Sequence, residues 1–275
     1  MKDIELFSLY SGSAGNAFLV AAHGVCFLID AGKSARSLCT AIRSCGHDPD
    51  DVQAIFVTHE HNDHINAIPV FLKQHPVPVH LPEDCVYKLA DDPWVQERLC
   101  PHTPVDSVLL GDIRITSFPT PHDSRGSVGY RVEIPTPDGM FRLGYATDIG
   151  YAAPIVEQNL TGCQAVVLES NHDPDMLRNG PYPAFLKQRI ASRRGHLSNA
   201  ESACLAARLC SAGTRSLMLA HLSMENNTPD TAYSECFGCI ASDAVQLCIA
   251  QPDCVTELPL EPGADTEGRI CSISP

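Results

Sequence analysis

Three histidines and an aspartate lie within one short stretch of the sequence, T-H-E-H-N-D-H at residues 58–64. The five residues that lead into it are apolar and partly β-branched, which predicts a short buried strand, and a helix is predicted after it. Alternate side chains of an extended segment point the same way, so His59 and His61 can bind one cation together. Asp63 and His64 lie where the chain turns into the helix and can face a second cation. Imidazole and carboxylate are ligands that zinc, manganese and iron accept.

The pattern H-x-H-x-D-H after a strand resembles the hallmark of the metallo-β-lactamase superfamily. This resemblance implies an α/β fold, a four-layer αββα sandwich with a metal site at one edge of its two sheets. A polar surface loop that happens to be rich in histidine is the alternative. Four ligand-type residues in six positions after a buried strand are too specific a pattern to favour that alternative.

Other predicted strands end in residues of the same types. His122 follows the alternating strand 113–118, Asp148 ends the second strand of a predicted hairpin, and His221 follows the apolar strand 216–220. Beside a metal loop, we expect all three to be ligands. An aspartate at a strand end can bridge two cations with its two oxygens. Asp30, which also ends a strand, is expected to support the metal loop without binding metal.

The resemblance therefore implies two divalent cations, Zn²⁺ or Mn²⁺, with iron also acceptable. The first would be held by His59, His61 and His122, and the second by Asp63, His64 and His221, with Asp148 between them. Paired cations of this kind clamp a phosphodiester, and a hydroxide that bridges them attacks phosphorus. Asp63 is thus counted both as a ligand and as a catalytic residue.

A second set of segments resembles ribonuclease Z. The segments G-H-L-S at 195–198 and L-A-H-L-S at 219–223 correspond to G-H-S-T and L-T-H-F-S of that family, and Glu169 ends the preceding strand. By this resemblance Glu169 orients His196, and the pair protonates the leaving oxygen. A histidine held by a carboxylate is a suitable general acid near neutral pH.

Motifs along most of the chain are similar to those of the YycJ/WalJ group of metallo-hydrolases. Besides the metal loop they are S-G-S-x-G-N at 11–16, E-S-N-H-D at 169–173, Y-P-x-x-L-K-x-R-I at 182–190, G-H-L-S-N at 195–199 and H-L-S-x-E-N-N at 221–227. The group is described as exonucleases that act on DNA from the 5′ end. The resemblance therefore implies a nucleic-acid substrate, with DNA favoured over RNA.

Several polar residues in these motifs are candidates for substrate contacts. His172, Asn226 and Asn227 can touch a substrate, although asparagine equally caps loops. The loop that contains Ser11 and Asn16 is rich in glycine and small hydroxyls, so it can present N–H groups to a phosphate, or it is a plain loop.

A basic cluster near the predicted helix 183–193 is a further candidate. Lys187, Arg189, Arg193 and Arg194 can follow a phosphate backbone, although a solvated helix face is favoured for any one of them. The net charge of −14 opposes nucleic-acid binding unless positive side chains are gathered near the site.

The bulk composition, with 44% hydrophobic and 19% charged residues, is typical of a globular protein. No signal peptide and no membrane-spanning run is visible, so we expect a cytoplasmic protein without membrane contact, folded as one domain over residues 1–275.

The 13 cysteines are odd in number and scattered, which favours reduced thiols over disulfides. For the one C-x-x-C, Cys236 to Cys239, we expect small apolar residues on a helix. The sequence indicates no oligomeric state.

Two other classes of function stay open. One is a small-molecule hydrolase that acts on a cyclic nucleotide, a phosphonate ester or a thioester. The other is a non-catalytic regulatory module, which the complete ligand set disfavours.

Among the remaining elements we expect helices at 35–45, 199–212 and 228–241, mainly helix with loops at 83–100, and a last strand at 254–258.

Overall fold

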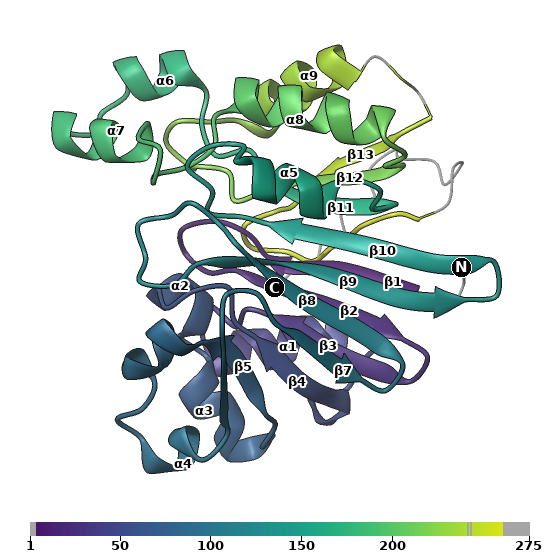
Figure 1. Cartoon of the computed structure of the whole chain (residues 1–275). Coiled ribbons are helices and arrows are strands. Elements are labelled where there is room, and N and C mark those ends of the chain that lie inside the picture. The colour runs from purple at the N-terminus through teal and green to yellow at the C-terminus, as the bar shows by residue number, and fades with distance from the viewer. Residues whose placement is uncertain (1–3, 241, 243, 261–275) are drawn as a thin grey trace.

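Two mixed β-sheets lie face to face between two layers of helices in the computed structural model, which describes residues 4–240, 242 and 244–260 (Figure 1). The first sheet contains β1 (Ile4–Tyr10), β2 (Ala17–Ala22), β3 (Val25–Ile29), β4 (Val52–Phe56), β5 (Val79–Pro82), β6 (Leu99–His102) and β14 (Thr256–Glu257). The second contains β7 (Ser107–Leu110), β8 (Ile113–Pro119), β9 (Val128–Thr136), β10 (Gly139–Ala146), β11 (Ala165–Glu169), β12 (Ser216–Ala220) and β13 (Gln246–Ile249). The predicted αββα sandwich is confirmed.

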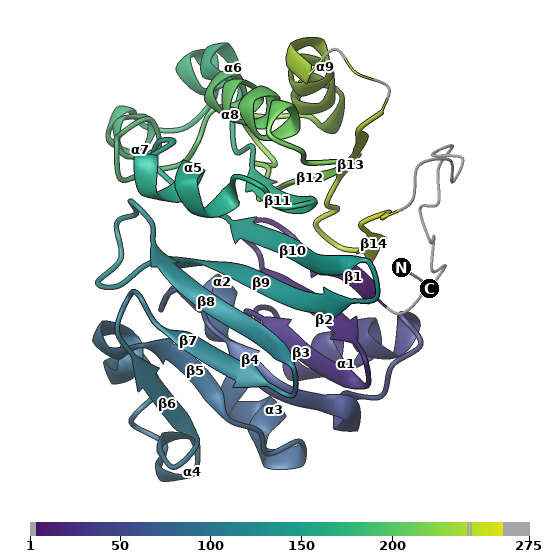
Figure 2. The same ribbon diagram turned by 45° about the vertical axis from the view of Figure 1, so that its right-hand side comes forward.

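The strand order brings many carboxyl-terminal strand ends to one edge. In the first sheet the order is β14-β1-β2-β3-β4-β5-β6, and the strands from β3 to β6 are parallel. In the second sheet the order is β13-β12-β11-β10-β9-β8-β7, and the strands from β10 to β13 are parallel (Figure 2). Strand β8 runs in the same direction as β10, because both are antiparallel to β9. Loops that follow β8, β10, β11 and β12 therefore meet at the same edge.

The helices cover the outer faces of both sheets. They are α1 (Ala35–Ser44), α2 (Asn62–Ile65), α3 (Ile68–Gln74), α4 (Pro93–Gln96), α5 (Pro154–Leu160), α6 (Pro174–Asn179), α7 (Ala184–Ile190), α8 (Asn199–Ser211) and α9 (Pro229–Ile240), with 3₁₀ turns η1 (Pro49–Asp51) and η2 (Glu83–Lys88). Among the described residues, none of the helices combines the length and the apolar character that crossing a bilayer requires.

Three apolar clusters hold the layers together. Phe18, Phe56 and Tyr130 are among the side chains buried between the two sheets. A second cluster joins the first sheet to α1 and α3, and a third joins the second sheet to α5, α8 and α9. Strands β3, β11 and β12 are buried on both faces, which explains why their sequences are continuous apolar runs.

Several expected elements differ from the structure. The segment 83–100, expected to be mainly helical, contains only η2 and α4 before Leu99 starts strand β6, because its last residues extend the parallel part of the first sheet. The predicted helix after the metal loop is split in two, since Pro69 fits the first turn of a new helix, α3.

Other boundaries changed less. The helix expected at 183–193 ends at Ile190, and the last strand is reduced to Thr256–Glu257. The helix expected at 228–241 is α9, although residue 241 lies outside the described residues. Strands β7 and β13 and helices α5 and α6 were not expected, because their segments are short and carry little periodicity. A single domain over residues 1–275 stays a prediction.

Candidate metal centre

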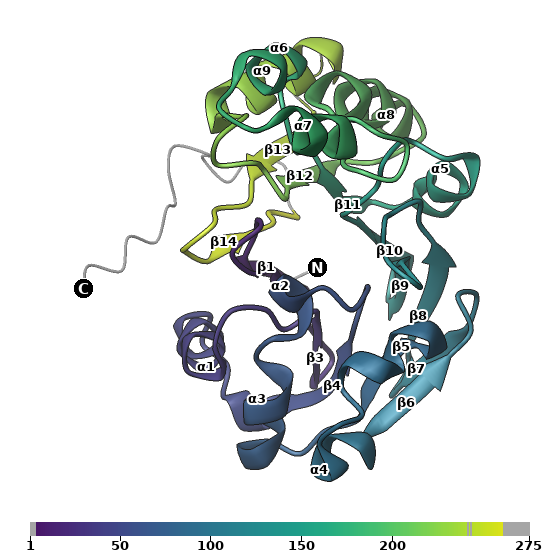
Figure 3. The same cartoon turned by 90° about the vertical axis from the view of Figure 1, so that its left-hand side faces the viewer.

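The seven expected ligands come together at the edge where α2 lies, which faces the viewer in Figure 3. Ligand atoms of His59, His61 and His122 all lie within 4.8 Å of one another. The same holds for Asp63, His64 and His221 as a second group, and for the set that joins Asp148 to His59 and His64. Two groups of three ligand-type side chains therefore adjoin, with Asp148 between them.

The backbone turns sharply where strands deliver these side chains. Asp30, Asp148 and His221 have φ angles of 62°, 55° and 56°, in the left-handed region that side chains other than glycine rarely adopt. Such conformations cost on the order of 1–3 kcal/mol each and persist where their surroundings hold them. At His221 the backbone N–H donates to Ser11 Oγ at 2.7 Å, and at Asp30 it donates to the Phe56 carbonyl at 2.8 Å.

The first group has its imidazoles oriented by neighbouring polar atoms. His122 Nδ1 lies 3.1 Å from the Gly195 carbonyl, while its Nε2 is buried and has no hydrogen-bond partner. His59 Nε2 lies 2.9 Å from His61 Nδ1. Burial, together with the nearby imidazoles of His64 and His122, lowers the pKa of His59 well below its ordinary value. A neutral imidazole keeps the lone pair that a cation needs.

The second group is held from behind by two buried carboxylates. His64 Nδ1 lies 2.8 Å from Asp30 Oδ2, and Asp30 also accepts a bond from the Thr58 N–H at 2.8 Å. Asp30 thus supports the metal loop, as expected. His221 Nδ1 lies 2.9 Å from Glu169 Oε1, while its Nε2 is buried without a hydrogen-bond partner.

These residues fit divalent cations. Three buried polar atoms at the centre have no hydrogen-bond partner, namely Nε2 of His122, Nε2 of His221 and Oδ2 of Asp148. Burying such atoms is costly unless something binds them. In His64, His122 and His221 the Nδ1 atom is occupied by a protein oxygen, which is the arrangement that leaves Nε2 for a metal.

His196 lies beside this centre and shares its supporting carboxylate. Its Nδ1 atom lies 2.8 Å from Glu169 Oε1, and the other Glu169 oxygen accepts bonds from the N–H groups of Ile149 at 2.7 Å and Leu197 at 3.1 Å. Burial opposes the imidazolium, but the charge of Glu169, its hydrogen bond to the ring and the charge of Asp148 together outweigh burial and raise the pKa of His196. The His196 side chain is 21% exposed, against 4% for His221, so His196 can reach a substrate.

Asn16 and Ser11, which were expected to contact substrate, are buried and bond to other parts of the protein. Asn16 is buried, and its side chain bonds to Gly12 and lies 3.1 Å from His64 Nε2. Ser11 accepts the His221 N–H. Both residues thus contact expected metal ligands, and the exposed members of their loop are Ser13 and Ala14.

The other polar candidates are also enclosed. Asn227 donates to the carbonyls of Ser170 and Asn171 at 2.9 and 3.1 Å, and Asn226 is fully buried. Burial lowers the pKa of His172 to about 4, and only 4% of this residue is exposed. Asn227 therefore holds the backbone that follows β11, whereas substrate contacts by His172 and Asn226 stay a prediction.

The basic cluster is mostly engaged within the protein. Lys187 Nζ donates to the Arg178 carbonyl at 2.8 Å, and Arg194 Nε donates to the His122 carbonyl at 3.0 Å. The Arg193 guanidinium lies 4.0 Å from the ring centroid of Tyr151. Arg189, which pairs with Asp123, is the one member of the four that lines the space around the metal centre.

Two hollows flank the metal centre. The first, here called the polar groove, has a volume of about 670 Å³ and is lined by Glu60, His61, Asn62, Asp63, Tyr87, Lys88, Asp123, Ser124, Arg125 and Arg189. The second, here called the small cavity, has about 180 Å³ and is lined by Ser13, Asn171, Tyr182, Leu186, Arg189, Ile190, Gly195, His196, His221, Leu222 and Ser223. Sequence reasoning missed Tyr87, Lys88 and Arg125, which belong to none of the motifs, whereas Tyr182 begins one of them.

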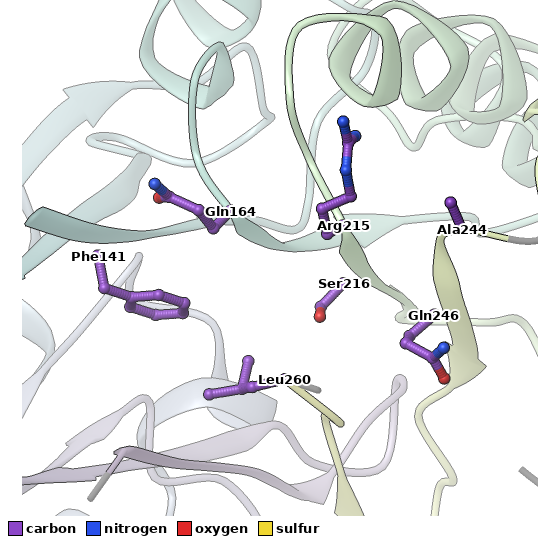
Figure 4. A pocket seen from close by; sticks show the side chains of 7 residues that line it. All are labelled: Phe141, Gln164, Arg215, Ser216, Ala244, Gln246 and Leu260. Atoms are coloured by element: carbon purple, nitrogen blue, oxygen red, sulfur yellow. The ribbon is translucent and has the colours of Figure 1, made fainter. Parts of the chain in front are cut away.

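A third hollow lies at the opposite ends of the strands. It has about 180 Å³ and is lined by Phe141, Gln164, Arg215, Ser216, Ala244, Gln246 and Leu260 (Figure 4). The Arg215 guanidinium points away from Phe141 and Leu260 and donates to the Cys210 and Thr214 carbonyls. With no His, Cys, Asp or Glu in its lining, this hollow offers no metal ligands. Nor do the metal-ligand groups found among the described residues include Cys236 or Cys239.

Comparison with known proteins agrees with this geometry. Residues 26–222 match the family described as "Beta-lactamase superfamily domain". Over 234 residues the chain is 33% identical to exodeoxyribonuclease YycJ of Bacillus anthracis, with 82% of this chain and 84% of that protein covered. It is 31% identical over 229 residues to exodeoxyribonuclease WalJ of Streptococcus pneumoniae, with coverage of 82% and 84%. A crystal structure of the metallo-β-lactamase fold protein YhfI from Bacillus subtilis has a TM-score of 0.69 at 18% identity, covering 93% of this chain and 99% of that chain, a likeness of fold.

Proposed function

This chain belongs to the β-lactamase superfamily and is a metal-dependent hydrolase, and we propose that it is a dinuclear phosphodiesterase that removes nucleotides from the 5′ end of nucleic acid. The observation that carries the proposal is the position of Asp148, which adjoins both ligand groups while His196 lies next to them. Two relatives named exodeoxyribonucleases support a nucleic-acid substrate and favour DNA over RNA.

The ligand sets follow from the two groups around Asp148. His59, His61 and His122 would hold one cation, and Asp63, His64 and His221 would hold the other, with Zn²⁺ and Mn²⁺ as the expected ions. When bound, such cations neutralise charge on a phosphodiester and lower the pKa of water.

The chain's own residues supply the proton transfer. A poor leaving group such as an alkoxide needs a proton as its bond to phosphorus breaks, and a positioned acid contributes this. His196 is the catalytic acid, because its ring is partly exposed and its Nδ1 is fixed by Glu169, which leaves Nε2 to donate. Glu169 is a positioning residue, since it has no exposed surface and its four bonds are all to protein atoms.

The polar groove suits the strand that follows the reacting phosphate. Two of its acidic side chains are engaged within the protein, because Glu60 accepts bonds from the Arg125 N–H and the Cys85 thiol, and Asp123 pairs with Arg189. The exposed Lys88 and Arg125 then face the groove with positive charge. The Arg125 guanidinium lies 4.1 Å from the ring centroid of Tyr87, which offers an aromatic face beside it. These basic side chains attract a phosphate backbone locally, although the net charge of the whole chain is −14.

Digestion of end-labelled strands tests the proposal. The purified protein is stripped with a chelator, loaded with Mn²⁺ or Zn²⁺, and given single- and double-stranded DNA and RNA labelled at the 5′ or the 3′ end. We expect stepwise release of the 5′ label as mononucleotide from DNA, and no release by Asp148→Ala. A folded, metal-loaded protein that leaves every strand intact would overturn the proposal and favour a small phosphodiester as substrate.

A further inference from the structure

The small cavity lies beside His196, which lines it together with His221. We propose that it binds the terminal nucleoside of the strand, the part that leaves when the phosphodiester is cut, with Tyr182 against its base. This inference rests on the proposed function and identifies the substrate contacts of the same site. It also gives a role to the motif at residues 182–190, which the metal centre does not use.

The position of the acid tells which side of the centre receives the leaving group. A general acid must lie within hydrogen-bond reach of the oxygen that it protonates. His196 lines the small cavity, whereas the ligands His61 and Asp63 line the polar groove. A phosphodiester at the centre therefore directs its leaving oxygen toward the small cavity and its retained strand into the polar groove.

The sizes of the two hollows set what each side can hold. The small cavity has about 180 Å³ against about 670 Å³ for the polar groove. The small cavity thus has about a quarter of the volume of the polar groove, which suits the base of one nucleotide but not a strand. One nucleoside on the leaving side and a strand on the other is the arrangement of a substrate cut at its 5′ end.

The bond changes follow from that placement. The P–O3′ bond of the terminal nucleotide breaks, and the oxygen of a water molecule joins phosphorus. His196 gives its proton to O3′ and recovers one from the water that attacked. The products are a mononucleotide with a 3′ hydroxyl and a strand that is one nucleotide shorter and carries a 5′ phosphate.

The wall of the small cavity has the chemistry of a base-binding surface. Tyr182, Leu186 and Ile190 line it at intervals of four residues, so their side chains lie on one face of α7 and its approach. Aromatic faces stack on any base, with little sequence preference. The exposed Ser13 and the partly buried Ser223 also line the cavity and offer hydroxyls to a sugar or a terminal phosphate.

The helix that forms this wall is hydrogen-bonded to the backbone of His196, the proposed acid. The His196 N–H donates to the Ile190 carbonyl at 2.9 Å, and a side-chain carbon at Gly195 would lie 2.1 Å from that same carbonyl oxygen. Arg189, between Leu186 and Gly195, pairs with Asp123, which follows the ligand His122. A nucleoside whose base is held by α7 would thus place the O3′ of its sugar at a fixed distance from the His196 ring.

The experiment compares one strand in two forms, with a normal 5′-terminal nucleotide or with an abasic one. Release of the first nucleotide is measured in a single turnover by the metal-loaded wild-type protein, by Tyr182→Ala and by Phe185→Ala. Phe185 is the matched control, because it lies on α7 beside Leu186, is 72% exposed and does not line the cavity.

Loss of the base and loss of Tyr182 are expected to have the same effect. The wild type should release the abasic nucleotide about tenfold more slowly than the normal one, the size expected for one stacking contact. Tyr182→Ala should release the normal nucleotide about tenfold more slowly and match the wild type on the abasic strand, while Phe185→Ala should match the wild type on both. Leu186→Trp, which fills the cavity, should also slow release of the normal nucleotide. The comparison of the two strands with the wild type does not depend on the folding of any variant.

The outcomes separate this inference from the function on which it rests. A wild type that digests strands but ignores the missing base, or a Tyr182→Ala protein that is slowed equally on both strands, overturns the cavity assignment alone. Digestion from the 3′ end overturns it too. If the loaded wild type digests no strand at all, the proposed function fails and the assignment fails with it.

Discussion

His196 and His221 share a single carboxylate oxygen, since their Nδ1 atoms lie 2.8 and 2.9 Å from Oε1 of Glu169. One imidazole belongs to the predicted second metal site, and the other is the predicted acid. Glu169 therefore couples the position of a predicted ligand to the position of the predicted proton donor. Its second oxygen is held by two backbone N–H groups, so the carboxylate cannot turn without breaking both.

Glu169→Gln and His196→Ala should have distinguishable effects. His196→Ala removes only the acid, so kcat on DNA should fall by roughly 10²–10⁴-fold while metal content stays that of the wild type. Glu169→Gln disturbs the ligand as well, so metal affinity should fall by about 10–100-fold along with activity. The measurements are single-turnover rates and metal titrations of the stripped proteins.

A substrate with a good leaving group provides the control. p-Nitrophenolate leaves without a proton, so bis-p-nitrophenyl phosphate should largely conceal the loss of His196 but not the change at Glu169. An equal loss for His196→Ala on both substrates would contradict its role as the acid.

The number of bound ions should depend on Asp63. Asp63→Ala removes a ligand of the second group only, so the protein should retain about one ion where the wild type binds two, and its phosphodiesterase activity should fall strongly. Asp138→Ala is the control, because Asp138 is exposed in the turn before β10 and belongs to neither ligand group. Metal analysis after gel filtration checks both. Full metal content and activity in Asp63→Ala would remove the basis for a dinuclear centre.

Close backbone packing at Gly32 should make this position intolerant of any side chain. An added carbon there would lie 2.0 Å from the Asp63 carbonyl oxygen and 2.5 Å from the Asn16 nitrogen. Gly32→Ala should therefore force apart the loops that carry Asn16 and Asp63, lower the free energy of unfolding by about 1–3 kcal/mol or more, and weaken metal binding.

Gly238 is the control for that substitution. It lies in α9, and an added carbon would meet nothing within 4 Å. Gly238→Ala should stabilise the helix by about 0.5–1 kcal/mol, because glycine loses more backbone freedom on folding. Urea unfolding of the metal-free proteins measures both changes. Equal stability of the two variants would contradict the expectation, because it would show that the loops around Gly32 can move to accommodate a side chain.

The metal loop could be predicted from sequence because its ligands are neighbours in the chain between a strand and a helix. His122, Asp148 and His221 could be predicted only because each lies at the end of a strand, and these three strands run in the same direction and end at one edge. The enclosure of Asn16 and Asn227 could not be predicted, since a buried amide that bonds to backbone looks the same in sequence as one that faces substrate. The contact of Glu60 with the Arg125 N–H joins loops that are 65 residues apart, so it could not be predicted from any local sequence pattern.

The polar groove should bind DNA through charge. Lys88→Ala and Arg125→Ala each remove one exposed cation from the groove, so each should weaken DNA binding by about the same factor for every sequence and reduce the slope of log K against log salt by about 1. Lys73→Ala is the matched control, because Lys73 is exposed on α3 and does not line the groove. Binding is measured by fluorescence anisotropy with the inactive Asp148→Ala protein as background. Unchanged slopes in both groove variants would show that the strand runs elsewhere, and the assignment of the retained strand to this groove would then be withdrawn.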